Sequence, residues 1–359
     1  MKDFAQQIKH VETYIQLPFA YNHWYIAGLK DSFERKPQAK TLLERSLVFF
    51  RTEAGKLVAM QNRCLHRSFP LSEGYLQGDQ LVCRYHGIEY NSDGSIHRIP
   101  IQKSCPDKKL RTYPVREFGP FAWIWMGDPD HPEIEERFPD VAFFEDGKHR
   151  TILEEMGINS NYLLMQENLN DLSHFVFLHM NSFPFEEWFF DLPWEVKKTP
   201  EGVFCNRIDR DPKRAIGALP PDIQERVKGR PVERHDGGYA VSPGVFKGFA
   251  PIIVGAADDP DREVFGQHIM HFMTPETRTK THYWWSISGD YALDNDMYWD
   301  FTKTIVSNGF AEDKWACEHM QSLLEDDNIA FEEMVIAGDK AGMLFRRVML
   351  DWIEDEQGA

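Results

Sequence analysis

The chain has 359 residues, of which 42% are hydrophobic and 27% charged, and it carries a formal net charge of −17. This acidity argues against nucleic-acid binding, which needs a basic face. No apolar run approaches the roughly 20 residues of a membrane span, and the N-terminus lacks the apolar stretch of a secretory signal. We therefore expect a cytoplasmic protein that binds neither membrane nor nucleic acid, long enough for two domains.

Short strand-like segments separated by turn formers fill residues 20–127. Residues 46–51 and 56–60 flank Ala54 and Gly55, a pattern typical of a hairpin. Further strands are expected at residues 87–90, 95–97 and 121–126. This half of the chain is predicted to be all-β.

The pattern changes after residues 127–132, which are rich in turn formers and close the first domain. The predicted elements beyond it are a helix at 161–179, mostly strands over 200–290, and helices at 313–337 and 340–355. The sequence therefore predicts an α+β protein whose β domain covers residues 20–128 and whose α+β domain covers residues 150–359.

Two cysteines and two histidines stand in paired arms within the β half, Cys64 with His66 and Cys83 with His86. Zinc fingers usually pair like ligands within an arm. Here each arm carries one Cys and one His, so each loop can reach both irons of a [2Fe–2S] cluster with two Cys on one iron and two His on the other. Zinc and chance placement are the alternatives. The remaining cysteines, Cys105, Cys205 and Cys317, are expected to be packing residues.

A second constellation begins the other domain, with Asn168, Asp171, His174 and His179 in the pattern Asn-x-x-Asp-x-x-His-x-x-x-x-His. Steps of three place the first three on adjacent helical turns. His179 follows His174 by five positions, a rotation of about 140°, so the two can share a metal only if the helix ends or is distorted between them. Two His and a distant carboxylate would form the facial triad of oxygen-activating Fe(II). Two hydrogen-bonded core histidines are the alternative.

Both motifs, in this order, resemble those of Rieske non-haem iron oxygenases. The resemblance runs from residues 22–25 to residues 345–348, and residues 273–277 and 281–285 are similar to the vanillate-demethylase and dicamba-demethylase branch. It implies an all-β Rieske domain followed by a catalytic domain with a helix-grip-like antiparallel sheet.

The resemblance also implies roles for individual residues. Cys64, His66, Cys83 and His86 would hold the cluster, and His174 and His179 would bind a mononuclear Fe(II). Asp171, with Asn168 beside it on the helix, would carry electrons from a cluster histidine, His86 of the neighbouring chain in a homotrimer.

The third iron ligand is expected in the C-terminal helix. Similar Glu-Asp segments of the family point to Asp326, after Glu325. Helix periodicity instead places Asp327 in an apolar stripe, where an unpaired carboxylate would be costly. Asp326 is the prediction and Asp327 the alternative.

The implied activity is that of a terminal oxygenase that hydroxylates a small, aromatic substrate with O₂, leading to O- or N-demethylation. Electrons would come from NAD(P)H through a ferredoxin or flavin reductase. Ring cis-dihydroxylation is the alternative within the enzyme class. An electron-transfer protein without oxygenase activity and a zinc-stabilised binding protein are the alternatives outside it.

Two weaker signals concern the substrate and the electron donor. His268 and His271 lie three apart on an expected strand, so at most one can face a pocket. Residues 61–116 carry nine Lys or Arg against five acids, a balance of +4, and such a basic collar would steer an acidic redox partner. An ordinary strand histidine and a mixed solvated surface are the respective alternatives.

Overall fold

The computed structural model describes residues 14–183, 185–326 and 333–358. The chain divides into two compact units, a smaller one of Tyr21–Phe138 with Thr274–Thr277, and a larger one of Met1–Ala20, Pro139–Met273 and Arg278–Ala359. Within the described ranges, no helix is long and apolar enough to cross a membrane.

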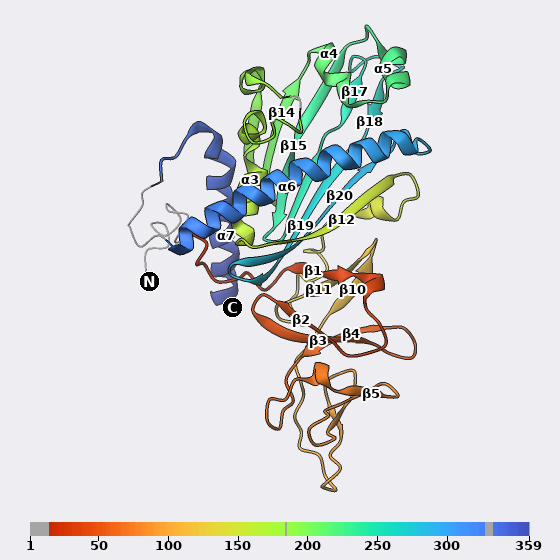
Figure 1. Cartoon of the computed structure of the whole chain (residues 1–359), viewed down its shortest axis with the longest axis vertical. Coiled ribbons are helices and arrows are strands. Elements are labelled where there is room, and N and C mark those ends of the chain that lie inside the picture. The colour runs from red at the N-terminus through yellow and green to blue at the C-terminus, as the bar shows by residue number, and fades with distance from the viewer. Residues whose placement is uncertain (1–13, 184, 327–332, 359) are drawn as a thin grey trace. The chain divides into compact units, whose positions relative to one another are not determined.

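The smaller unit is built from three antiparallel sheets (Figure 1). The first has the order β1-β11-β10, with β1 Trp24–Leu29, β10 Val115–Phe118 and β11 Phe121–Trp125. The second is β2-β3-β4-β9, with β2 Gln38–Leu42, β3 Arg45–Arg51, β4 Leu57–Gln61 and β9 Thr112–Tyr113. The third is β5-β6-β7-β8, with β5 Tyr75–Gln77, β6 Gln80–Val82, β7 Glu89–Tyr90 and β8 Ile96–Arg98.

The predicted hairpins of this unit are confirmed. β3 pairs with β4 around Gly55, whose φ of 81° suits the left-handed turn that the sequence predicted. β7 pairs with β8 across the turn that contains Gly94. The short segment Thr274–Thr277 belongs to this unit because its backbone oxygens accept hydrogen bonds from the amides of Leu43 and Glu44.

The larger unit contains one antiparallel sheet in the order β12-β20-β19-β16-β15-β14-β13, with β17 paired to β15 and β18 paired to β17. Its strands are β12 Arg150–Ile158, β13 Trp194–Thr199, β14 Gly202–Asp209, β15 Val232–Ser242, β16 Val245–Phe249, β17 Ile252–Val254, β18 Glu263–Phe265, β19 Gln267–Thr277 and β20 Lys280–Gly289. This sheet bears out the prediction of strands over residues 200–290 and of an α+β second half.

The helices of this unit include α3 Tyr162–Asn170, α6 Asp296–Asp326 and α7 Lys340–Gly358. α6 runs across one face of the sheet (Figure 1), packing on β12 and α3, while α7 packs on β13, β14 and α3. Short helices fill the connections: η3 Ala142–Phe144, η4 Leu172–Val176, η5 Glu187–Asp191, α4 Pro212–Ala215, η6 Ile216–Ala218, α5 Pro221–Val227 and η7 Ala337–Asp339.

Two helix predictions were wrong. The predicted helix at 161–179 ends at Asn170, because Asp171 is extended (φ −115°, ψ 101°) and a separate 3₁₀ turn follows. The helix expected to begin at Asp313 begins seventeen residues earlier, at Asp296, where the side chain of Asn295 accepts a hydrogen bond from the amide of Tyr298. Its predicted extension to Ala337 also fails, because residues 333–336 are not helical.

Candidate active site

The two Cys-His arms of the smaller unit adopt the same backbone geometry. In each arm the cysteine amide binds the carbonyl five residues on, Cys64 to Phe69 at 2.9 Å and Cys83 to Ile88 at 2.8 Å. The amides of Ser68 and Gly87, four residues after each cysteine, return to the cysteine carbonyl, and both residues have positive φ. The two arms are therefore equivalent halves of one site.

The four side chains of these arms sort by type as a Rieske cluster requires. Cys64 and Cys83 are buried in the core of the unit, whereas His66 and His86 are exposed. The two Nδ1 atoms lie 3.1 Å apart, close to the roughly 3.0 Å expected for two ligands about 2.1 Å from one metal ion at a right angle. The donor set fits a [2Fe–2S] cluster with its histidine iron at the surface.

The hydroxyl of Tyr90 contacts the first Cys-His arm of this site. Its hydroxyl lies 3.2 Å from Cys64 Sγ and accepts a hydrogen bond from the Leu65 amide at 3.1 Å. Burial raises the pKa of the Tyr90 hydroxyl, so it stays protonated and can donate to the sulfur. A hydrogen bond to a cluster sulfur is one of the protein's means of setting the cluster potential.

The second site depends on the helix break at Asp171. After the break, the η4 turn carries His174, and the chain then turns so that His179 faces the same point. The rings of the two histidines lie 5.0 Å apart between centroids. The condition that the sequence set for a shared metal, an interrupted helix, is thus met.

Three donor atoms converge at this point: His174 Nε2, His179 Nε2 and a carboxylate oxygen of Asp313. Asp313 Oδ1 lies 3.3 Å from His174 Nε2 and 3.2 Å from His179 Nε2. Neither Nε2 atom has a well-directed hydrogen-bond partner, although both are buried. The distances approach the roughly 3.0 Å between neighbouring ligands on one octahedral face, so the donor set fits a mononuclear iron.

Hydrogen bonds on the outer side of each ligand fix its orientation. His174 Nδ1 bonds the backbone oxygen of Asp171 at 2.5 Å, and His179 Nδ1 bonds Glu312 Oε2 at 2.8 Å. Asn168 Nδ2 donates to Asp313 Oδ1 at 3.0 Å. Partners of this kind turn the Nε2 atoms toward the metal position.

The charges of the site reinforce one another. Burial alone would raise the pKa of Asp313, but hydrogen bonds and charge interactions with His174 and His179 hold it well below its usual value. Burial likewise would lower the pKa of His179, and the carboxylates of Asp313 and Glu312 raise it instead. Asp313 is thus a buried carboxylate held in its anionic form beside the two imidazoles.

In the described part of the chain, the carboxylate beside the two histidines is that of Asp313, whereas the prediction was Asp326. Both residues lie on α6, thirteen positions apart (326 − 313), which is about 20 Å along a helix. Asp327 lies outside the described residues. Two residues of the apolar stripe that favoured this helix end are exposed, Met320 at 43% and Leu323 at 69%, and Leu324 is half-buried.

Asp171 lies beside the histidine site and not in it. Its carboxylate caps η4, accepting hydrogen bonds from the amide and the hydroxyl of Ser173, both at 2.8 Å. It also lines a small cavity of about 320 Å³ together with Glu167 and Arg346. The Asp171 side chain therefore borders this cavity, while the backbone oxygen of the same residue contacts His174.

A larger cavity of about 870 Å³ opens onto the histidine site, between the sheet and α6. Its walls near the site are apolar: Phe175, Phe183, Phe246, Ile269, Ile305 and Phe310. His271 lines it and bonds the Tyr283 hydroxyl at 2.6 Å, whereas His268 is not among the lining residues and stacks on Phe143 at 4.3 Å. One histidine of the pair faces the cavity, as strand alternation predicts.

A paired-arm site for an iron–sulfur cluster and a two-histidine, one-carboxylate site in the same chain define the class of Rieske-type oxygenases. Comparison with known proteins places both sites in recognised families. Residues 23–114 match the Rieske [2Fe-2S] domain, and residues 158–355 match the vanillate O-demethylase oxygenase C-terminal domain.

Individual proteins are similar over nearly the whole chain. The vanillate O-demethylase oxygenase subunit of Pseudomonas sp. strain HR199 is 28% identical over 364 residues, covering 95% of this chain and 97% of that protein. A toluene-4-sulfonate monooxygenase iron-sulfur subunit of Comamonas testosteroni is 28% identical over 348 residues, covering 93% and 96%. The crystal structure of dicamba monooxygenase bound to 3,6-dichlorosalicylic acid superposes with a TM-score of 0.79 at 24% identity, covering 96% of this chain and all of that one.

The chain belongs to the vanillate O-demethylase oxygenase family. It is a Rieske-type oxidoreductase of the monooxygenase kind, the oxygenase component of a multicomponent system. The predicted class, fold and cofactor types are confirmed.

Proposed function

We propose that this chain hydroxylates a methyl carbon of an apolar, aromatic substrate with O₂, so that O- or N-demethylation follows. The observation that carries the proposal is the convergence of His174 Nε2, His179 Nε2 and Asp313 Oδ1 at the wall of an apolar cavity. The relative named for vanillate O-demethylation supports a methyl group as the point of attack, and the one named for toluene-4-sulfonate monooxygenation supports an aromatic substrate.

His174, His179 and Asp313 would hold the iron, which when bound supplies the activation of O₂ beside the substrate. The protein's own part is positional. Asn168 and Glu312 fix the carboxylate and one imidazole, and the phenylalanine walls exclude water and orient an apolar substrate.

Cys64, His66, Cys83 and His86 would hold the cluster that receives electrons from an NAD(P)H-dependent reductase, directly or through a ferredoxin. The exposed histidine end of the cluster favours electron exchange at the surface. The basic balance of residues 61–116 suits an acidic donor.

Asp171 would link the two centres between chains of a homotrimer. Its carboxylate borders the 320 Å³ cavity and its backbone oxygen binds His174, so a histidine such as His86 of a neighbouring chain could enter and bind it. A carboxylate between two metal-bound imidazoles orients both rings and connects them.

Metal analysis and formaldehyde release test the proposal together. The reconstituted protein should bind about three iron atoms per chain, two in the cluster and one at the histidine site, and after chemical reduction it should release formaldehyde from a methoxy- or N-methyl-arene under O₂. An electron carrier would bind only the cluster iron, and a zinc protein would be colourless; either result would overturn the proposal.

A further inference from the structure

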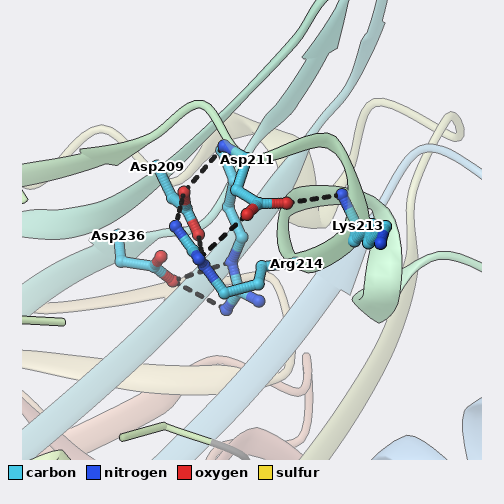
Figure 2. Close-up of polar contacts among 6 residues, drawn as sticks. Asp209, Asp211, Lys213, Arg214 and Asp236 are labelled. Atoms are coloured by element: carbon cyan, nitrogen blue, oxygen red, sulfur yellow. Dashed lines mark hydrogen bonds and ion pairs between the residues drawn. The ribbon is translucent and has the colours of Figure 1, made fainter. Parts of the chain in front are cut away.

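The far end of the large cavity carries charged side chains that the metal chemistry does not use. We call this end the polar wall, and its cavity-lining residues are Asp209, Lys213, Arg214, Arg234 and Asp236. Figure 2 shows its hydrogen bonds and ion pairs, with Asp211 beside them. Asp209 and Asp236 are buried, whereas Lys213 is exposed. Burying ion-paired carboxylates costs desolvation and adds little stability, which points to a role for this end of the cavity beyond stability.

Ion pairs hold two of its three cations in place. Arg214 donates from Nε and Nη2 to the two oxygens of Asp209, both at 2.9 Å, and from Nη1 to Asp211 at 3.0 Å (Figure 2). Arg234 donates from Nε and Nη2 to Asp236 Oδ1 at 3.1 and 2.7 Å. These paired guanidiniums form a fixed surface.

Two donor groups of the wall remain free of protein partners in the described part of the chain. Lys213 is exposed; its backbone amide donates to Asp211, and its ammonium group makes no ion pair there. Arg234 Nη1 has no hydrogen-bond partner there, and the guanidinium lies over the Phe185 ring, 5.5 Å from its centroid. The cavity-lining charges of the wall are three cations against two anions, a balance of +1, because Asp211 binds Arg214 without lining the cavity.

Strand register gives the distance from the metal end to the polar wall. His271 lies at the metal end, because the charge of Asp313 acts on its pKa. It pairs with Phe246 on β16, and Phe246 pairs with Ala240 on β15. Asp236 and Arg234 lie four and six residues from Ala240 along β15, or about 13 and 20 Å of strand. A single aromatic ring is too short to touch both ends.

Glycines form part of the floor between the two ends. Gly238 and Gly248 pair directly across β15 and β16, and Gly237 and Gly248 line the cavity. The packing of the sheet leaves no room for larger residues, because a Cβ at Gly238 would meet the Phe246 ring at 2.4 Å and one at Gly248 would meet the Ile269 backbone oxygen at 2.6 Å. The volume of about 870 Å³ also far exceeds the roughly 150 Å³ that accommodates benzene.

We propose that the substrate is a monoanion longer than one aromatic ring. Its apolar body lies over the glycine floor, its carboxylate or sulfonate binds Lys213 and Arg234, and the carbon to be oxidised lies at the histidine end. This inference rests on the proposed function for the oxidised carbon only, because binding of the anion can be measured without turnover.

Calorimetry with the iron-loaded holoenzyme, without O₂, tests the inference. The probes are benzoate, biphenyl-4-carboxylate, biphenyl-4-sulfonate and the neutral 4-methylbiphenyl. A biphenyl acid should bind at least about tenfold more tightly than benzoate, and Lys213→Gln should weaken its binding about tenfold, the effect of one charge-assisted hydrogen bond. The neutral probe should be unaffected by the substitution.

Lys228→Gln is the matched control, because Lys228 is exposed on the neighbouring α5 end, pairs with Glu225 and does not line the cavity. It should leave every affinity unchanged. A loss confined to one of the two anions supports the proposal and identifies the group. Equal affinities for benzoate and both biphenyl acids, or equal weakening of charged and neutral probes by Lys213→Gln, would overturn it whether or not the protein proves to be an oxygenase.

Discussion

The Tyr90 hydroxyl lies 3.2 Å from Cys64 Sγ, within hydrogen-bond distance. A hydrogen bond to that sulfur stabilises the reduced, more negative cluster. Tyr90→Phe should therefore lower the midpoint potential of the cluster while leaving its iron content intact, as measured by a redox titration followed in the visible spectrum. An unchanged potential would mean that the hydroxyl serves only packing and the Leu65 amide.

Asp313 should be indispensable at the mononuclear site. Asp313→Asn removes the one anionic ligand, so iron content should fall to the two atoms of the cluster and demethylation should fall by at least about 100-fold, beyond the 10- to 100-fold cost of losing an outer hydrogen-bond partner. Asp326→Asn is the control and should retain the third iron. Loss of iron in the second variant with retention in the first would restore the ligand that the sequence favoured.

His271 should make folding sensitive to acid. Burial lowers its pKa to about 3 despite the nearby Asp313 charge, whereas an unfolded histidine titrates near 6.5. As the pH falls below 6.5, His271 therefore binds a proton in the unfolded chain but not in the folded one. This residue lowers the free energy of unfolding by about 1.4 kcal/mol for each pH unit between pH 6.5 and 3. Urea unfolding of His271→Gln should lose that share of the pH slope, and parallel slopes would contradict the assignment.

The grouping of the two Cys-His arms, and of His174 with His179, could be predicted because these residues stand close together in the sequence. The carboxylate that joins the two histidines could not, because two Glu-Asp pairs lie on the same helix, Glu312-Asp313 and Glu325-Asp326. A signal was present. One face of α6 is buried and carries Phe310, Asp313, Cys317 and Gln321 at helical spacing. Asp313 is the one carboxylate among these four residues, which marks it as the candidate ligand.

At the scale of elements, the break between α3 and η4 joins the two functions of Asp171. The carboxylate caps η4 through Ser173, and asparagine is also a good cap. Asp171→Asn should therefore keep both metal sites and the melting temperature, yet reduce the rate of electron transfer to the mononuclear iron by at least about 100-fold, as measured by stopped-flow oxidation of the reduced cluster. Ser173→Ala, which removes only a hydroxyl donor, serves as control, and retained transfer in Asp171→Asn would remove the bridging role.

Element prediction succeeded where the pattern is local. Hairpins such as β3-β4 can be predicted from a glycine between two apolar runs. The break at Asp171 is different, because the sequence predicted one helix over residues 161–179 and the extended backbone of Asp171 ends it at Asn170. α6 likewise begins at Asp296, well before the predicted start at Asp313, because packing against the rest of the fold decides where this helix begins.

At the scale of the whole molecule, a cluster at the surface of one unit and an iron site in the other are useful only if electrons pass between them. We propose that electron transfer runs through Asp171 to a histidine of a neighbouring chain, and this route requires the chains to associate.

Single turnover of the chemically reduced protein under ¹⁸O₂, with methoxy- and N-methyl-arenes offered as substrates, shows whether the chain demethylates. We expect one equivalent of formaldehyde and a demethylated product, with a single labelled oxygen atom introduced at the methyl carbon. A cis-diol carrying two labelled oxygens, or oxidation of the cluster without any product, would contradict it.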